Sequence, residues 1–310
     1  MSLQNLLLSY GLRKRLKRGA PPGQIDVAGT RRAMARFGHD ARVPAGWRIE
    51  RSGEAALPGE WTRREAAQAR AGANADVPTL FYLHGGGYYF CTPQTHRPLT
   101  LALARMAGMQ VFSLDYRLAP EHPFPAALDD AVDAYAALLA RGISPGHLVI
   151  AGDSAGGGLA LATLLALRAR GMPLPSGALL FSPWTDLAAT GATLRSNDRH
   201  DVMFHGESIG RAARLYLGNA AATDPLASPL YADPAALAAL PPLYVQASDK
   251  EVLLDDSRRL VERARAAGGN AELHIWRGVP HVWQLYHPFL PEARRALADA
   301  AAFARRISNA

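Results

Sequence analysis

The chain has 310 residues, of which 49% are hydrophobic and 20% charged, which is the composition of one large soluble globular domain and excludes a disordered or fibrous chain. A chain of this length can bury enough apolar surface to fold without disulfides or structural metals. The net charge is +7, but dense basic sequence is confined to Arg13-Lys14-Arg15-Leu16-Lys17-Arg18 and arginines elsewhere alternate with acidic residues, so we predict no nucleic-acid partner.

The N-terminal segment does not have the pattern of an export signal. Its apolar part is short, and the basic run follows it, whereas a signal peptide begins with its basic residues. No stretch approaches the roughly 18 apolar residues of a membrane span.

Cys91 is the only cysteine and cannot form an internal disulfide, which fits a reducing compartment. We therefore expect a cytoplasmic protein with no integral membrane segment. A peripheral membrane helix over residues 6–18 is the alternative.

From about residue 77 onward, short β-rich runs alternate with longer helical patterns, and this alternation predicts a doubly wound, mostly parallel sheet. The predicted strands, each of which looks buried on both faces, are 79–83, 110–114, 147–151, 178–181, 243–247 and 272–276. The predicted helices lie near 98–107, 126–140, 155–169, 256–267 and 292–306. Upstream, 47–51 and 59–62 predict two short strands in an antiparallel start to the sheet, which gives about eight strands.

Two segments do not fit the alternation, residues 1–45 and residues 186–227. A connection as long as 186–227 inside a compact fold is usually a lid or a binding element. We therefore divide the core into residues 46–185 and residues 228–310, interrupted by this insertion.

The run Gly152-Asp153-Ser154-Ala155-Gly156 matches the pattern G-x-S-x-G. It follows an apolar run and precedes a helical pattern, and a tight turn from strand to helix exposes the serine hydroxyl as a nucleophile. The pattern alone is modest support, because an incidental Gly-rich turn would produce it too.

A second motif, His84-Gly85-Gly86-Gly87, ends the apolar run at 79–83. Ester cleavage passes through a tetrahedral oxyanion, and glycines let backbone N–H groups approach that oxygen. We predict Gly85, Gly86 and Ala155 as the oxyanion donors. His84 is interpreted as a structural residue that pins the loop.

In this arrangement the acid and then the histidine follow the nucleophile along the chain. His281 lies on the loop after the strand predicted at 272–276 and is the candidate base, whereas His274 lies within that strand and is interpreted as a packed core residue. The acid should follow the strand at 243–247, where Asp249 and Glu251 both qualify. Asp255 and Asp256 are interpreted as the N-cap and the first-turn acid of the next helix.

Three motifs together resemble the hormone-sensitive lipase family, which includes the bacterial family IV carboxylesterases. They are His84-Gly85-Gly86-Gly87-Tyr88, the run from Tyr116 to Ala127 (YRLAPEHPFPAA) and Gly152-Asp153-Ser154-Ala155-Gly156-Gly157. The resemblance spans roughly residues 77–306. It implies an α/β-hydrolase fold in which residues 1–45 and 186–227 form a helical cap over the site.

The resemblance also bears on individual residues. The family's acid pattern D-x-L-x-D, laid on residues 251–255, puts Glu251 at the catalytic place, where Asp is commoner, and leaves Asp249 as the alternative acid. Asp153 and Glu121 resemble family residues that support the active-site loops. Trp184 and Tyr88 are candidate substrate-binding residues, although Trp184 could equally be a packed aromatic at the base of the insertion.

The sequence therefore predicts a serine carboxylesterase with Ser154, His281 and Glu251 as its catalytic residues, no cofactor and no metal. The resemblance implies short- to medium-chain acyl esters and allows a homodimer. Lactones, amides and carbamates are alternative substrates, since they pass through similar tetrahedral species. A non-catalytic small-molecule receptor on the same scaffold is the alternative from another class.

Overall fold

The computed structural model of the chain describes residues 1–17, 23, 25–36, 41–65 and 77–308, and Arg18 of the basic run lies outside them. In chain order the elements are α1 (Leu3–Leu12), the π-helical turn η1 (Arg13–Lys17), α2 (Val27–Met34), β1 (Trp47–Arg51), β2 (Gly59–Arg64), β3 (Thr79–Leu83), α3 (Pro93–Ala107), β4 (Gln110–Leu114), α4 (Ala126–Ala140), η3 (Pro145–His147), β5 (Leu148–Asp153), α5 (Ala155–Ala169), β6 (Gly177–Phe181), α6 (Thr193–Ser196), α7 (Gly206–Leu217), η4 (Pro229–Tyr231), α8 (Pro234–Ala238), β7 (Leu243–Ser248), α9 (Leu254–Ala266), β8 (Ala271–Trp276), η5 (Trp283–Tyr286) and α10 (Pro291–Ser308).

The described strands form one eight-stranded sheet in the order β1-β2-β4-β3-β5-β6-β7-β8. β2 pairs antiparallel with both β1 and β4, and every other neighbouring pair is parallel. The predicted α/β fold with a doubly wound, mostly parallel sheet is confirmed, and so is the antiparallel start. Parallel strands all point the same way, so the loops that follow β3, β5, β6, β7 and β8 meet at one edge of the sheet.

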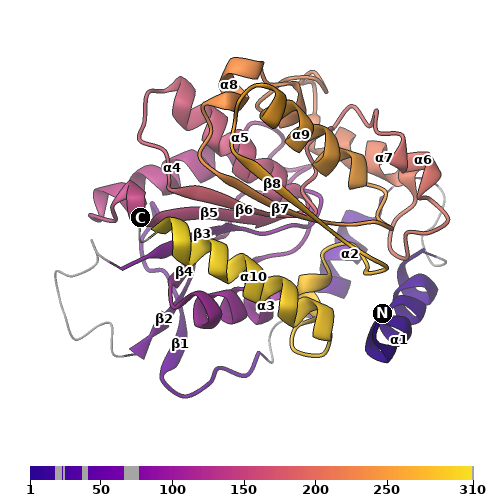
Figure 1. Cartoon of the computed structure of the whole chain (residues 1–310), viewed down its shortest axis with the longest axis horizontal. Helices are drawn as coiled ribbons and strands as arrows, with labels where there is room; N and C mark the ends of the chain where they lie inside the picture. Colours follow the sequence, from indigo (N-terminus) through magenta and orange to yellow (C-terminus); the bar gives the residue numbers. More distant parts are fainter. Residues whose placement is uncertain (18–22, 24, 37–40, 66–76, 309–310) are drawn as a thin grey trace.

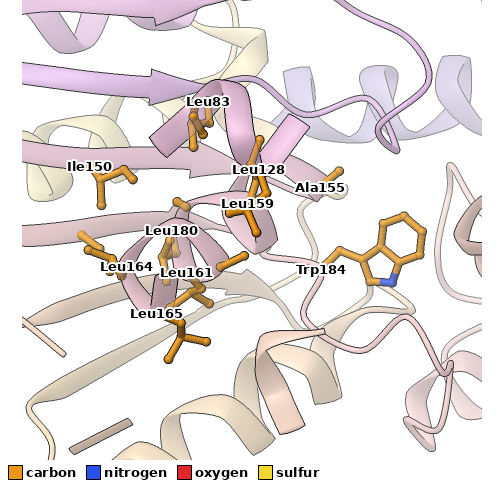
Figure 2. Close-up of a cluster of buried hydrophobic side chains, with 14 of the residues drawn as sticks. Leu83, Leu128, Ile150, Ala155, Leu159, Leu161, Leu164, Leu165, Leu180 and Trp184 are labelled. Atoms are coloured by element: carbon orange, nitrogen blue, oxygen red, sulfur yellow. The ribbon is translucent and has the colours of Figure 1, made fainter. Parts of the chain in front are cut away.

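Helices cover both faces of this sheet, and each face has its own apolar core. α3 and α10 lie on one face, with the α4, α5 and α9 layer on the other (Figure 1). The larger core joins α4 and α5 to the sheet. Figure 2 shows part of it, where leucines of α5 pack with Leu83, Ile150 and Leu180 from β3, β5 and β6. Burial of both faces explains why the central strands are nearly continuous apolar runs.

Two helix starts differ from the prediction. α3 begins at Pro93, five residues earlier than expected, because Thr92 and Thr95 form a capping box and Pro98 is accommodated inside the helix. α9 begins at Leu254, which places Asp255 and Asp256 inside its first turn. The expected first-turn acid is therefore confirmed, whereas the expected N-cap aspartate is wrong, since the cap position belongs to Leu253.

The prediction that the strand at 272–276 is buried on both faces is wrong. β8 is the last strand of the sheet, and His274 and Ile275 in its middle are exposed. His274 is 45% exposed and stacks at the surface on Tyr244, so it is not the packed core residue that we expected. An edge strand lacks a neighbour on one side, and the helices cover it only in part.

The two segments that break the alternation contact each other. Lys17 Nζ donates to the carbonyl oxygens of Asp201 and Phe204, both at 3.0 Å, and Arg13 donates to the carbonyl oxygen of Arg199 at 3.1 Å. Figure 1 shows α1, α2, α6 and α7 together at one end of the molecule. These contacts support the proposal that residues 1–45 and 186–227 build one cap.

The N-terminal helix presents apolar side chains to solvent. Leu3, Leu6, Leu7 and Tyr10 of α1 are each more than half exposed. Across the described residues, no helix combines the length and the hydropathy needed to span a bilayer. The peripheral membrane helix therefore stays a prediction.

Removal of a ring from the middle of the sheet should lower stability strongly. Phe112 of β4 is fully buried and its ring lies 4.8 Å from that of Trp61. We expect Phe112→Ala to lower the free energy of unfolding by about 3 to 5 kcal/mol, because it removes apolar contacts and leaves a cavity. Urea unfolding followed by circular dichroism measures this. Ile275→Ala on the exposed edge strand is the control, with an expected change of about 0.5 kcal/mol or less. Equal losses in the two variants would contradict the assignment of the core.

Candidate active site

Ser154 occupies a strained turn between β5 and α5. Its φ of 51° and ψ of −121° lie in a region that costs about 1 to 3 kcal/mol for a residue with a side chain. The turn is held from both sides, because the Ser154 N–H donates to the carbonyl oxygen of Phe181 at 2.8 Å and its own carbonyl oxygen accepts from Trp184 N at 2.9 Å. The strand-to-helix context predicted for G-x-S-x-G is present, and these two bonds hold the serine backbone in place.

The last glycine of this motif allows α5 to touch the loop after β3. A Cβ atom on Gly156 would lie 2.1 Å from the carbonyl oxygen of Leu83 and 2.5 Å from that of His84. Those distances are far below van der Waals contact, so only glycine fits at this position. The two glycine motifs of the sequence are therefore in direct contact.

Asp153, next to Ser154, is a buried carboxylate that organises the loop after β3. Its Oδ1 accepts hydrogen bonds from Tyr82 Oη at 2.6 Å and from Gly85 N at 2.9 Å, and His96 Nε2 lies 3.2 Å away. Burial raises the pKa of Asp153, but the contacts with His96, Tyr82 and Gly85 outweigh burial and hold its pKa below the usual range. The carboxylate is therefore ionised and fixes the start of the loop.

This arrangement corrects one predicted oxyanion donor. Gly85 has a single N–H, and that hydrogen is committed to Asp153, so the prediction that Gly85 donates to an oxyanion is wrong. Within the described part of the chain, the N–H groups of Gly86, Gly87 and Ala155 donate to no other residue. Both Gly86 and Gly87 have positive φ values, 113° and 58°, as a tight glycine turn requires.

His84 is held in the interior beneath the loop. Its ring stacks on Tyr116 with centroids 4.2 Å apart, and Tyr116 Oη donates to the His84 carbonyl oxygen at 2.6 Å. Burial lowers the pKa of His84 to about 3, so the ring is neutral at physiological pH. These contacts agree with the loop-pinning role interpreted from the sequence.

Among the described residues, His281 and Glu251 form the closest acid–histidine pair. His281 Nδ1 lies 2.5 Å from Glu251 Oε2, and the other carboxylate oxygen, Oε1, accepts from Ser248 N at 2.9 Å. Both side chains are buried. Burial lowers the pKa of His281, but the hydrogen bond and the charge of Glu251 outweigh it and leave the pKa raised. Because Nδ1 donates to the carboxylate, Nε2 is left as the ring's acceptor.

Asp249, the alternative acid, points elsewhere. Its Oδ1 accepts from Gly278 N at 2.7 Å and so links the loop after β7 to the loop after β8. Of the two carboxylates left open by the sequence, only Glu251 contacts His281.

The serine and the histidine loop are both held at the end of β6, by its last residue and by the residue that follows it. Ser154 N donates to the carbonyl oxygen of Phe181, and Val282 N donates to Ser182 Oγ at 3.3 Å. No hydrogen bond joins Ser154 to His281 among the described residues, and His281 Nε2 is buried without a partner there. The ring nitrogen that could accept a proton is therefore free.

Residues of the insertion surround the acid–histidine pair, and no sequence motif marks them. Asp201 Oδ2 accepts from Val252 N at 2.9 Å, and Asn197 Nδ2 donates to the carbonyl oxygen of Glu251 at 2.9 Å. The ring of Phe204 meets His281 edge-on, with centroids 5.3 Å apart and planes at 78°. Residues 197–204 thus shield the pair from water.

Asp256 is another supporting residue, and its contacts with the segment after β6 were not predicted. Its Oδ2 accepts from the backbone N–H groups of Thr185 and Asp186, both at 2.8 Å. The carboxylate therefore ties the segment after β6 to α9. Burial raises the pKa of Asp256 to about 8.

The two candidate substrate-binding residues belong to one aromatic cluster. Tyr88 stacks on Tyr216 of α7 with centroids 3.7 Å apart and planes at 6°, and Trp184 lies 6.0 Å from Tyr88. Both Tyr88 and Trp184 reach the first turn of α5, because a Cβ atom on Gly158 would lie 3.0 Å from Tyr88 Oη and 2.1 Å from the Trp184 carbonyl oxygen. Figure 2 shows the Trp184 side chain together with Ala155 and the core leucines. These aromatic side chains therefore form one buried cluster at the first turn of α5, the helix that begins directly after Ser154.

The described residues offer no site for a metal ion. Among them, no group of three or more His, Cys, Asp or Glu side chains is arranged to hold one.

Comparison with known proteins gives one consistent result. Residues 80–285 match a family profile described as alpha/beta hydrolase fold. The chain is 47% identical to an acetyl-hydrolase of Streptomyces hygroscopicus over 237 residues, which cover 76% of this chain and 78% of that protein. It is 41% identical to an esterase of Acinetobacter venetianus, with 79% of each chain covered.

Solved structures agree with these relatives. An esterase from the bacterial hormone-sensitive lipase family superposes with a TM-score of 0.89 at 41% identity, with 99% of each chain covered. EstE5 soaked with p-nitrophenyl butyrate superposes with a TM-score of 0.89 at 37% identity and covers 100% of both chains.

The contact between His281 and Glu251 predicts a measurable pKa change. Glu251→Gln removes the negative charge and leaves the burial, so the pKa of His281 should fall from its raised value to below that of an exposed histidine. NMR titration of the histidine ring signals in the two proteins measures this. Glu292→Gln, which changes a carboxylate bonded to Ser2, is the control and should leave the pKa of His281 unchanged. The same His281 pKa in Glu251→Gln and in the unaltered protein would contradict the described pair.

Proposed function

Since this chain belongs to the α/β-hydrolase family and is an ester hydrolase of the hormone-sensitive lipase group, we propose that it is a carboxylesterase that acts through Ser154, His281 and Glu251. The observation that carries the proposal is the His281–Glu251 contact of 2.5 Å on a loop held against the segment that also holds Ser154. The alternative, a non-catalytic small-molecule receptor, is not consistent with a chain that is an ester hydrolase.

In the first half of the proposed reaction, Ser154 Oγ attacks the carbonyl carbon of the ester while His281 Nε2 takes its proton. Glu251 orients the ring and stabilises the imidazolium that forms. The carbonyl oxygen becomes an oxyanion and accepts hydrogen bonds from the unpaired N–H groups of Gly86, Gly87 and Ala155. When the tetrahedral species collapses, His281 gives the proton to the alcohol that leaves.

In the second half, water attacks the acyl-serine ester with His281 again as the base, and the acid product leaves with Ser154 restored. The sequence positions of the three residues follow the order serine, acid, histidine that this fold uses. The His281 ring is buried and its pKa is raised. This suits a general base, because the imidazolium of the intermediate lies beside a fixed carboxylate.

We also propose that the enzyme prefers short- to medium-chain acyl groups. The stacked rings of Tyr88 and Tyr216, with Trp184 beside them, pack at the first turn of α5, and we infer that these bulky buried rings limit the room for a long acyl chain beside the serine. The name of one relative, an acetyl-hydrolase, agrees with a small acyl group.

Replacement of the nucleophile should abolish hydrolysis. We expect Ser154→Ala to lower kcat on p-nitrophenyl acetate by about 10⁴-fold or more, because no other group can form the acyl-enzyme. Release of p-nitrophenol measures the rate, and thermal melting checks the fold. Ser144→Ala at an exposed serine is the control. A Ser154→Ala variant with unchanged kcat would rule out the mechanism.

An acyl-length series tests the preference. Among p-nitrophenyl acetate, butyrate, octanoate and palmitate, we expect kcat/KM for palmitate to be lower than for butyrate by about tenfold or more, because the aromatic cluster obstructs the longer chain. Tyr216→Ala should move the preference toward longer chains, whereas Tyr216→Phe, which keeps the stacked ring, should not. A palmitate preference in the unaltered enzyme would refute the proposal.

A further inference from the structure

Arg31 of α2 makes four hydrogen bonds to two active-site loops, although it comes from the N-terminal segment. Its Nε donates to the carbonyl oxygen of Tyr89 at 2.8 Å, and its Nη2 donates to the carbonyl oxygen of Ala119 at 2.8 Å. Nη1 and Nη2 also bind both carboxylate oxygens of Glu121, at 2.8 and 2.7 Å. A planar guanidinium has five N–H donors in a fixed fork, and lysine cannot reproduce this set of bonds.

The loops that Arg31 joins are those after β3 and β4. Tyr89 belongs to the first loop and Ala119 to the second, and the two loops also meet directly through Ala119 N, which donates to the Tyr88 carbonyl oxygen at 2.9 Å. Glu121 provides a carboxylate that holds the guanidinium in place. Arg31 therefore completes a contact between α2, the glycine loop and the loop after β4, which carries the APEHP part of the run from Tyr116 to Ala127.

The Tyr89 carbonyl lies in the same turn as the proposed oxyanion donors. Tyr89 N and Phe90 N both donate to the Gly86 carbonyl oxygen at 3.0 Å, so residues 86–90 form one hydrogen-bonded turn. Asp153 holds the start of the loop at Gly85, and Arg31 holds its far side at Tyr89. Between these two charged anchors lie Gly86 and Gly87, whose N–H groups donate to no other described residue.

We propose that Arg31 is a positioning residue for the reaction: it fixes the turn at residues 86–90 so that the N–H groups of Gly86 and Gly87 point at the oxyanion. Catalysis by such donors depends on their being oriented before the charge develops, because reorientation during the reaction costs free energy. Docking of α2 on the core is thereby coupled to the quality of the oxyanion site. This inference rests on the proposed function, since it assumes that the glycine turn binds an oxyanion.

The test compares Arg31→Ala, Arg31→Lys and Glu121→Gln with Arg32→Ala, a neighbouring exposed arginine of the same helix. We expect Arg31→Ala to lower kcat on p-nitrophenyl acetate by about 10- to 100-fold with KM changed little, because the lost interaction acts in the transition state. The kcat of Arg31→Lys should fall nearly as far as that of Arg31→Ala. The kcat of Glu121→Gln should fall less, because Arg31 keeps its contacts with both carbonyl oxygens in this variant. The kcat of Arg32→Ala should equal that of the unaltered enzyme.

A second readout separates positioning from general loosening of the structure. A trifluoromethyl ketone adds to the serine and places an oxyanion in the glycine turn, so its inhibition constant should rise in Arg31→Ala by the same factor as kcat falls. Thermal melting checks that each variant is folded, and Arg31→Lys and Glu121→Gln keep the test valid if Arg31→Ala does not fold.

Two results would overturn the inference. One is a kcat for Arg31→Ala equal to that of Arg32→Ala, and the other is a fall in kcat without any loss of affinity for the ketone. Failure of the proposed function would look different, because the Ser154→Ala variant would then hydrolyse the ester as fast as the unaltered enzyme.

Discussion

The carboxylate of Asp153 is buried at the end of β5, and a buried negative charge is costly unless donors surround it. Those donors come from three places: Tyr82 from β3, the Gly85 N–H from the following loop, and His96 from α3. The need to satisfy one charge therefore fixes the glycine loop relative to the residue that follows Asp153, which is Ser154. The proposed nucleophile and the proposed oxyanion donors depend on this single carboxylate for their mutual position.

The rest of the site is held in a similar way, by polar groups that join loops from different strands. Asp256 ties the segment after β6 to α9, Asp249 joins the loops after β7 and β8, and Arg31 joins α2 to the loops after β3 and β4. Such supports hold a strained residue like Ser154 in place, because the surrounding contacts outweigh its unfavourable backbone angles. The insertion adds Asp201 and Phe204 around Glu251 and His281.

Much of the fold was predictable because parallel strands buried on both faces are marked by short apolar runs. The predictions failed where a residue's neighbours come from distant sequence. His274 looked like a core residue, but β8 is the edge of the sheet. Asp256 was expected only to complement the start of a helix, but its carboxylate also accepts hydrogen bonds from the backbone of Thr185 and Asp186. Gly85 looked like an oxyanion donor, but its N–H is bonded to Asp153.

The sequence by itself determined the kind of fold, the serine turn and the set of candidate groups, because glycine patterns and apolar runs reflect local backbone geometry. Only the tertiary structure decided between Asp249 and Glu251 as the partner of His281, and only it showed which glycine N–H groups remain unpaired. Arg31 stands in a helix with no motif, and its four bonds reach residues 58 to 90 positions away. A hydrogen bond depends on where two atoms lie in space, and over such separations the folded chain alone brings them together.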